Sequence, residues 1–113
     1  MKYKVCTEDY FRLLKATERI RQGEIIIELP DIPLAERDMY SIEVHPGVHV
    51  DCSKSPVGAI NHACKANAAV RNGEIVAWAC IEPGEEITIN YRMTETHLTA
   101  PFVCKCCNEK MEW

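Results

Sequence analysis

Short hydrophobic runs separated by turn residues recur along the chain. The segment 86–91, which reads E-I-T-I-N-Y, alternates polar and apolar residues with the two-residue period of a half-buried strand. Six prolines punctuate the sequence and leave no long uninterrupted helix between them. The pattern predicts a mostly β protein, with strands over 3–6, 24–29, 40–44, 48–51, 68–71, 75–81 and 86–91.

The dipeptide Asn72-Gly73 lies between two of these strands and predicts a hairpin. A two-residue type I′ turn needs positive φ at both central positions, which Asn and Gly adopt more easily than other residues. We therefore expect the strands on either side of this dipeptide to pair antiparallel.

The segment 7–23 carries two conflicting signals. Thr7 as an N-cap, two acidic residues after it and Gly23 as a terminator are typical of an amphipathic helix. The pattern I-x-x-G-E at 20–24, however, returns at 81–85, where Pro83 disfavours a continuous helix and favours a turn into a strand. By this echo we interpret the first copy as a turn between strands, with a short helical turn allowed at 8–12.

Length, composition and charge limit the classes of protein to consider. The 113 residues are 47% hydrophobic, which fits one compact domain with one core. The net charge of −4 argues against a generally basic nucleic-acid-binding surface, and no apolar run approaches the roughly 20 residues of a membrane span. The N-terminus turns acidic before a signal-peptide core can form, so we expect an intracellular protein, cytoplasmic in a bacterium and nuclear or host-directed otherwise.

Seven cysteines cannot all pair within one chain, because the number is odd. In a reducing compartment, clustered cysteines suggest a metal before a disulfide. Cys6, Cys52 and Cys80 lie in strand-like context instead, and we expect them, with Trp78, to be core residues.

Two constellations carry candidate chemistry. The segment 61–67, N-H-A-C-K-A-N, can bind a polar ligand through its amide and imidazole groups, or a metal through His and Cys. The alternative is a plain turn whose Asn side chains bond to local backbone. The second constellation, G-E-E-I-T-I-N-Y at 84–91, is by itself only a solvated strand that ends in an aromatic residue.

Taken together, the two constellations and the C-x-C of the tail at 104–106 resemble the SET-domain family of protein lysine methyltransferases. The segment 14–24 is similar to the strand, turn and strand that open the family's domain, and the insert at 30–50 is very short. The resemblance implies a SET-domain (β-clip) fold of several small sheets with a threaded C-terminal segment. It also implies a SET domain over 1–100 and a post-SET-like cysteine tail over 101–113.

The resemblance implies a role for each matched position. Asn61 and His62 would hold S-adenosylmethionine, and Tyr91 matches the catalytic tyrosine. Tyr40 and Ile89 would line the channel for the substrate lysine, where Ile89 is smaller than the family's frequent Phe or Tyr and would leave room for more than one methyl group.

Phe11, Arg12 and Leu13 stand where the family carries a cofactor-binding G-x-G motif, so this chain departs from the pattern. Because only glycine allows such close approach of the backbone, these side chains would fill part of the cofactor site.

The cysteines of the tail raise a question of their own. Cys64, Cys104 and Cys106 match three of the four zinc ligands found in many relatives, but the fourth position is Met111, a poor ligand for zinc. Cys107, a histidine, water or a partner chain would then supply the fourth ligand. The alternative is that the cysteines stay free and reduced and pack the tail over the cofactor site.

The resemblance implies S-adenosylmethionine-dependent methylation of the ε-amine of a lysine in a histone or another basic protein. The alternative is a catalytically weak SET-like module that binds a basic peptide or a partner protein. In both cases the partner is a protein rather than a membrane or a nucleic acid, and a homodimer is compatible with the small size.

Overall fold

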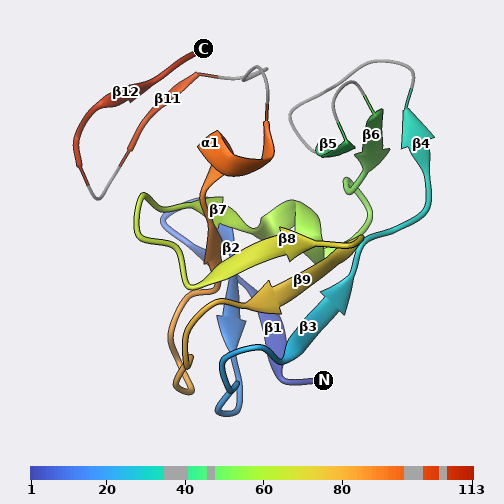
Figure 1. The fold of residues 1–113 in the computed structure, drawn as a ribbon. Coiled ribbons are helices and arrows are strands. Elements are labelled where there is room, and N and C mark those ends of the chain that lie inside the picture. The colour runs from blue at the N-terminus through green and yellow to red at the C-terminus, as the bar shows by residue number, and fades with distance from the viewer. Residues whose placement is uncertain (35–40, 46–47, 96–100, 105–106) are drawn as a thin grey trace.

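The computed structural model describes residues 1–34, 41–45, 48–95, 101–104 and 107–113. In this part of the chain the fold is mostly β, made of small sheets around one core, as predicted (Figure 1). Two three-stranded antiparallel sheets lie in the middle and at the upper right of this view. In spatial order, the strands of one are β3 (Ile25–Glu28), β9 (Glu74–Ala77) and β8 (Ala68–Arg71), and those of the other are β4 (Pro33–Leu34), β6 (Val48–Asp51) and β5 (Ser41–His45).

Three further pairs of strands complete the fold. The hairpin of β1 (Tyr3–Glu8) and β2 (Phe11–Ala16) lies at the N-terminus, and β11 (Phe102–Val103) pairs with β12 (Lys110–Met111) in the tail. The third pair is parallel and joins β7 (Asn61–His62) to β10 (Thr88–Ile89). The short helices are the 3₁₀ turn η1 (Pro56–Ala59) and α1 (Tyr91–Thr94). Among the described residues, no helix has the length and apolar character that crossing a bilayer requires.

The hairpin predicted at Asn72-Gly73 is confirmed. Asn72 and Gly73 have φ values of +50° and +76° and join β8 to β9 in an antiparallel hairpin. The segment that had also suggested a helix forms the β1–β2 hairpin instead. Its turn residues Asp9 and Tyr10 have φ values of +49° and +69°, so the helical turn allowed at 8–12 does not form.

The repeated I-x-x-G-E pattern proves to be a structural repeat. Ile20 and Ile81 pair with each other in an antiparallel bridge, and each donates its N–H to the other's carbonyl at 2.8 Å. The glycines that follow, Gly23 and Gly84, have φ values of +86° and +87°. Such values at the third position of a turn define type II geometry, which a preceding proline favours. The two copies therefore fold alike and pack side by side at the base of the core.

The expected positions of Trp78 and Cys80 in the core are wrong. β9 ends at Ala77, because the N–H groups of Trp78 and Ala79 both turn to the carbonyl of Asn67. Trp78 is left 62% exposed, and Cys80 is also exposed, where it accepts a hydrogen bond from Arg19 Nε at 3.3 Å. Of the other cysteines expected inside, Cys52 is fully buried, whereas Cys6 is only half-buried.

The strand expected at 86–91 is shorter than predicted. β10 covers only Thr88–Ile89, and Tyr91 is the first residue of α1. The reason is the side chain of Asn90, which accepts a hydrogen bond from Arg92 N at 3.0 Å and so acts as an N-cap. The aromatic residue therefore sits at a strand-to-helix turn and not at the end of a flat strand.

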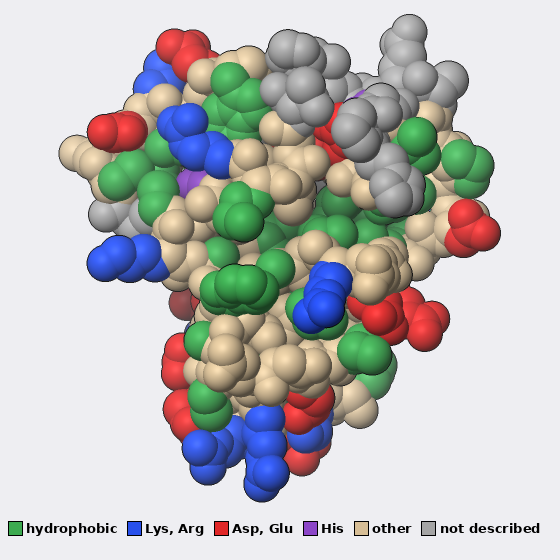
Figure 2. Space-filling view, viewed as in Figure 1, with side chains coloured by type: hydrophobic (Ala, Val, Ile, Leu, Met, Phe, Trp, Pro, Cys, Tyr) green, Lys and Arg blue, Asp and Glu red, His purple; other side chains and the backbone are tan. Residues whose placement is uncertain are grey.

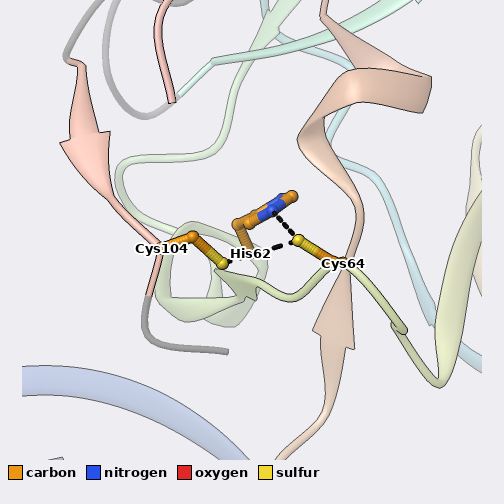
Figure 3. A group of neighbouring side chains, drawn as sticks. All are labelled: His62, Cys64 and Cys104. Carbon is orange, nitrogen blue, oxygen red and sulfur yellow. Dashed lines mark hydrogen bonds between the residues drawn. The ribbon is translucent and has the colours of Figure 1, made fainter. Parts of the chain in front are cut away.

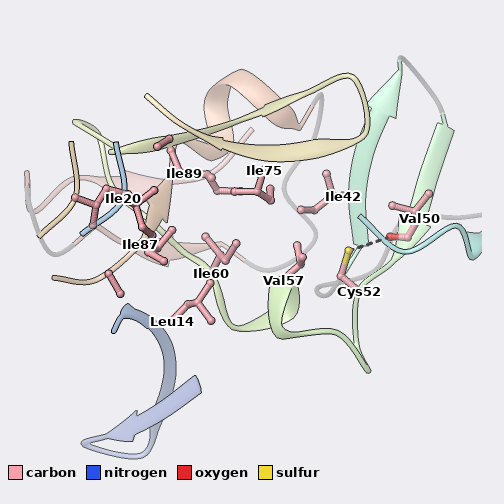
Figure 4. Packing of buried hydrophobic residues seen from close by; sticks show 14 residues of the cluster. Leu14, Ile20, Ile42, Val50, Cys52, Val57, Ile60, Ile75, Ile87 and Ile89 are labelled. Carbon is pink, nitrogen blue, oxygen red and sulfur yellow. Dashed lines mark hydrogen bonds between the residues drawn. The ribbon is translucent and has the colours of Figure 1, made fainter. Parts of the chain in front are cut away.

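The core joins the sheets into one unit. Figure 4 shows the buried aliphatic side chains that converge from the strands, from η1 and from the residues beside them, including Leu14, Ile60, Ile75 and Ile87. The core thus holds η1 in place, and η1 leads through Ile60 into β7, which carries the Asn-His pair.

The surface in Figure 2 mixes acidic and basic side chains, so that face carries no broad patch of one sign.

Gly58 lies in η1, and we predict that Gly58→Ala destabilises the protein by about 2 kcal/mol, because overpacking costs 1–3 kcal/mol. A Cβ there would lie 2.4 Å from the backbone oxygen of Cys52. Urea unfolding followed by circular dichroism measures the change. Gly84→Ala is the control, since its Cβ would meet nothing within 4 Å and strain only its own backbone. A Gly58→Ala protein as stable as the wild type would contradict the close packing of η1.

Candidate functional site

The site is built on the parallel pairing of β7 with β10. Thr88 lies opposite Asn61, and Ile89 lies opposite His62. Parallel neighbours require a crossover, which the β8–β9 hairpin and the second I-x-x-G-E turn supply here. The pairing brings the two sequence constellations side by side and places Tyr91 next to the Asn-His pair.

Tyr91 is held at both ends. Its backbone N–H donates to His62 Nδ1 at 3.0 Å, and its hydroxyl donates to the carbonyl of Ile60 at 2.6 Å. The two rings lie 5.3 Å apart. The phenol is therefore fixed in position and direction, which is what a group that orients a reactant needs.

The bond from Tyr91 also determines the protonation of His62. Because Nδ1 accepts a hydrogen bond, the proton of the neutral ring must be on Nε2, which faces Cys64 Sγ at 3.6 Å. Burial lowers the pKa of His62 below its usual value, and the nearby positive charge of Arg92 lowers it further. His62 is thus neutral at neutral pH and donates from Nε2 towards sulfur.

Asn61 ties the site to the first hairpin. Its Nδ2 donates to the carbonyl of Arg12 and to Glu86 Oε2, each at 3.0 Å. The three residues at the G-x-G position lie in β2, where Phe11 is 59% exposed, Arg12 is exposed and Leu13 is buried in the core. The first two side chains therefore do not fill the interior, and it is the backbone of this strand that meets Asn61.

Asn67 is a residue whose part in the site the sequence did not reveal. Its side chain accepts from Thr88 N at 2.9 Å and donates to the carbonyl of Glu86 at 2.8 Å. These bonds cross to the β10 segment, so Asn67 does more than close a local turn, the alternative considered for this motif. The motif N-H-x-C-x-x-N was the sequence signal for this role, because it places a second asparagine, Asn67, six residues after Asn61.

The tail folds back over the site. The ring of Phe102 lies 5.6 Å from that of His62 and 5.9 Å from that of Tyr91. Arg92 of α1 contacts the Trp113 ring at 4.9 Å and donates to Met111 Sδ at 3.5 Å. Figure 1 shows α1 between this tail and the β4–β6–β5 sheet. The tail thus packs the aromatic ring of Phe102 against the His62–Tyr91 pair.

Cys64, whose Sγ faces His62, has two further sulfur atoms close to it. Cys64 Sγ lies 3.6 Å from Cys104 Sγ and 3.5 Å from Cys107 Sγ (Figure 3 shows the first pair with His62). Thiolates on one tetrahedral zinc lie about 3.8 Å apart, given Zn–S bonds of about 2.3 Å. His62, Cys64 and Cys104 each offer a ligand atom within 4.8 Å of the other two, so this group could hold a metal ion. Cys106 lies outside the described residues.

Ile89 and Tyr40 are the two positions that were expected to line the lysine channel. Ile89 is only 2% exposed and belongs to the core cluster, with its neighbour across the pairing being His62. Tyr40 lies outside the described residues. Cys107, one of the candidates for the fourth zinc ligand, lies with its Sγ 3.5 Å from that of Cys64.

Comparisons with known proteins agree on the fold. The family model described as SET domain matches residues 12–92. A solved structure of a candidate histone methyltransferase from Plasmodium falciparum matches with a TM-score of 0.63 and 19% sequence identity, covering 80% of this chain and 92% of that one. No curated protein matches the chain.

The ionisation of Tyr91 provides a test of this geometry. Burial, with smaller effects of Glu95 and Glu86, raises the pKa of Tyr91 to about 12. An unfolded tyrosine ionises near 10, so the unfolded chain loses this proton first. The contribution of Tyr91 to stability is therefore complete below pH 10 and is lost as the pH rises towards 12.

We predict that the phenolate absorbance of the wild type, compared with that of Tyr91→Phe, shows one phenol that titrates near 12. The free energy of unfolding of the wild type falls between pH 10 and 12 more steeply than that of Tyr91→Phe. If the phenol that Tyr91→Phe lacks titrated near 10 in the wild type, this result would contradict the buried, hydrogen-bonded hydroxyl.

Proposed function

The chain belongs to the SET-domain family, and on that premise we propose that it is a protein-lysine methyltransferase that uses S-adenosylmethionine. The family match supports methyltransferase activity in general. The Plasmodium falciparum protein is described as a candidate histone methyltransferase, which supports a basic protein with an exposed lysine as the substrate. The observation that carries the proposal is the fixed Tyr91 hydroxyl beside the Asn61–His62 pair.

The residues around β7 fit the proposed cofactor. Asn61 and His62 would hold it, together with the backbone of β2 at Arg12, which Asn61 already contacts. The exposed side chains of Phe11 and Arg12 leave that backbone edge uncovered by core packing. When bound, S-adenosylmethionine supplies a methyl group on a positively charged sulfur.

The substrate lysine must lose a proton before its nitrogen can attack. Its pKa is near 10.4 in water, so the amine is mostly protonated at neutral pH. A site lined by the rings of Tyr91, His62 and Phe102 disfavours the charged ammonium, as does a neighbouring positive sulfur. A strong side-chain base is then unnecessary.

The remaining requirement is alignment. The Tyr91 hydroxyl donates its proton to the Ile60 carbonyl and keeps its lone pairs for the N–H of a neutral lysine. Its raised pKa keeps the phenol neutral across the physiological range. In this mechanism Tyr91 orients the amine for in-line attack and does not remove its proton.

The G-x-G position favours a second candidate function. Phe11, Arg12 and Leu13 replace glycines with larger side chains, so a catalytically weak module that binds a basic peptide or partner protein is the alternative. Calorimetric titration with S-adenosylmethionine, followed by a methyl-transfer assay, separates the two. Cofactor binding without transfer favours the module, and transfer favours the enzyme.

We predict that Tyr91→Phe lowers methyl transfer by about 100-fold or more, the scale seen when one oriented hydrogen-bonding group is removed. Transfer of labelled methyl to histones or lysate proteins measures the rate, and the affinity for S-adenosylmethionine should stay close to that of the wild type. Tyr3→Phe is the control, since Tyr3 is a second tyrosine that packs against the core and lies at the start of β1. Unchanged turnover in Tyr91→Phe would remove Tyr91 from the mechanism.

The sulfur cluster supports a structural zinc as part of the same proposal. Cys64, Cys104 and Cys107 would bind it, with Cys106 as the fourth thiolate. His62 is unsuited to that place, because its Nε2 carries the proton while Nδ1 accepts from Tyr91. It would instead donate to the Cys64 thiolate, a bond of the kind that tunes metal ligands.

We predict that protein purified without added zinc contains about one zinc ion per chain, measured by mass spectrometry of the metal content. Cys107→Ser should lose most of that zinc and lower the melting temperature, because the tail is no longer tied to Cys64. Cys80→Ser, at an exposed cysteine outside the cluster, should keep the zinc. Wild-type protein without stoichiometric metal would leave the alternative of free cysteines.

A further inference from the structure

The hairpin of β5 and β6 buries both of its faces. Ile42 and Val50 lie opposite each other and belong to the hydrophobic core. Residues one step further along a strand point to the other side, and there Glu43 lies opposite His49. Each is only 8% exposed, although one carries a carboxylate and the other an imidazole. The second face of this hairpin is therefore a buried polar site.

A third polar side chain reaches the same place from α1. Glu95 is the C-cap of this helix, and its N–H bonds to the carbonyl of Tyr91 at 2.8 Å. A carboxylate oxygen of Glu43, another of Glu95 and one ring nitrogen of His49 all lie within 4.8 Å of one another. The β5–β6 hairpin and the end of α1, which are distant in sequence, thus bring their donor atoms together.

His49 also has an unsatisfied atom. In the described part of the chain, its buried Nδ1 has no hydrogen-bond partner. A buried polar atom without a partner is costly, and native proteins rarely keep one without a ligand, an ion or a functional reason. The carboxylates of Glu43 and Glu95 lie close to this imidazole.

We propose that Glu43, His49 and Glu95 form a second metal site, which binds one divalent transition ion such as Mn²⁺. Two carboxylates and an imidazole are the donors that such ions take, whereas Mg²⁺ and Ca²⁺ prefer oxygen alone. Donors on opposite sides of one ion lie up to about 4.2 Å apart, given bonds of about 2.1 Å, so small side-chain rotations close the site. Its donors are harder than the thiolates beside His62, so the two sites differ in their preferred metal.

The position of this site suggests what the ion does. It would join the β5–β6 hairpin to the end of α1, the helix that begins at Tyr91. The binding of the ion does not depend on methyl transfer, so the proposal stands or falls separately from the proposed function.

Titration of the full-length protein with Mn²⁺, followed by the loss of the free-ion signal in electron paramagnetic resonance, tests the proposal. We expect one Mn²⁺ to bind per chain. His49→Gln and Glu95→Gln should each weaken binding by about 10-fold or more, while Glu28→Gln, at an exposed carboxylate on β3, should not change it. Circular dichroism checks that each variant is folded. Of the three site residues, Glu95 is the one that is only half-buried, so its substitution disturbs the core less than that of Glu43 or His49.

A measurement on the unaltered chain complements the variants. Pulsed electron paramagnetic resonance of the Mn²⁺-bound wild type should show coupling to an imidazole nitrogen, which exposed carboxylates cannot produce. Three results would each overturn the proposal: no Mn²⁺ binding, no nitrogen coupling, or an affinity for Mn²⁺ in His49→Gln and Glu95→Gln equal to that of the wild type.

Discussion

The parallel contact between β7 and β10 is the interaction on which the rest of the structure depends. Each strand is two residues long, yet their pairing brings Asn61 and His62 next to the segment that carries Tyr91. So short a ladder cannot hold itself together, since isolated strand pairs are marginal in water. It is stabilised by the buried core under η1 and by Asn67, whose side chain bonds to the backbone of Glu86, just before β10, and of Thr88, its first residue.

Neutral groups dominate the centre of the site. The Tyr91 phenol keeps its proton to about pH 12, and burial and Arg92 hold the pKa of His62 low. One hydrogen bond links these facts, because Tyr91 N–H occupies His62 Nδ1 and sends the imidazole proton towards Cys64. The same bond connects the aromatic site to the sulfur cluster, so the tail and the proposed reaction site share one histidine.

Much of the fold could be predicted from local patterns. The turn at Asn72-Gly73 and the repeated glycine turns followed from backbone rules, because positive φ is a property of the residue itself. One error arose where a distant group overrode the local pattern, and the other where a neighbouring side chain capped a helix. Trp78 left the strand when Asn67 captured its N–H, and Tyr91 began a helix because Asn90 capped it. The alternation of polar and apolar residues records neither of these bonds.

The order of residues alone was sufficient for the family, the mostly β class and the pairing of an Asn-His motif with a distant tyrosine. These features are encoded in residue types at short spacings, which physical chemistry restricts locally. Three-dimensional packing alone decided that Cys107 approaches Cys64, and that Glu43, His49 and Glu95 converge. Such meetings join segments far apart in the chain, and no spacing within one segment encodes the distance between two of them.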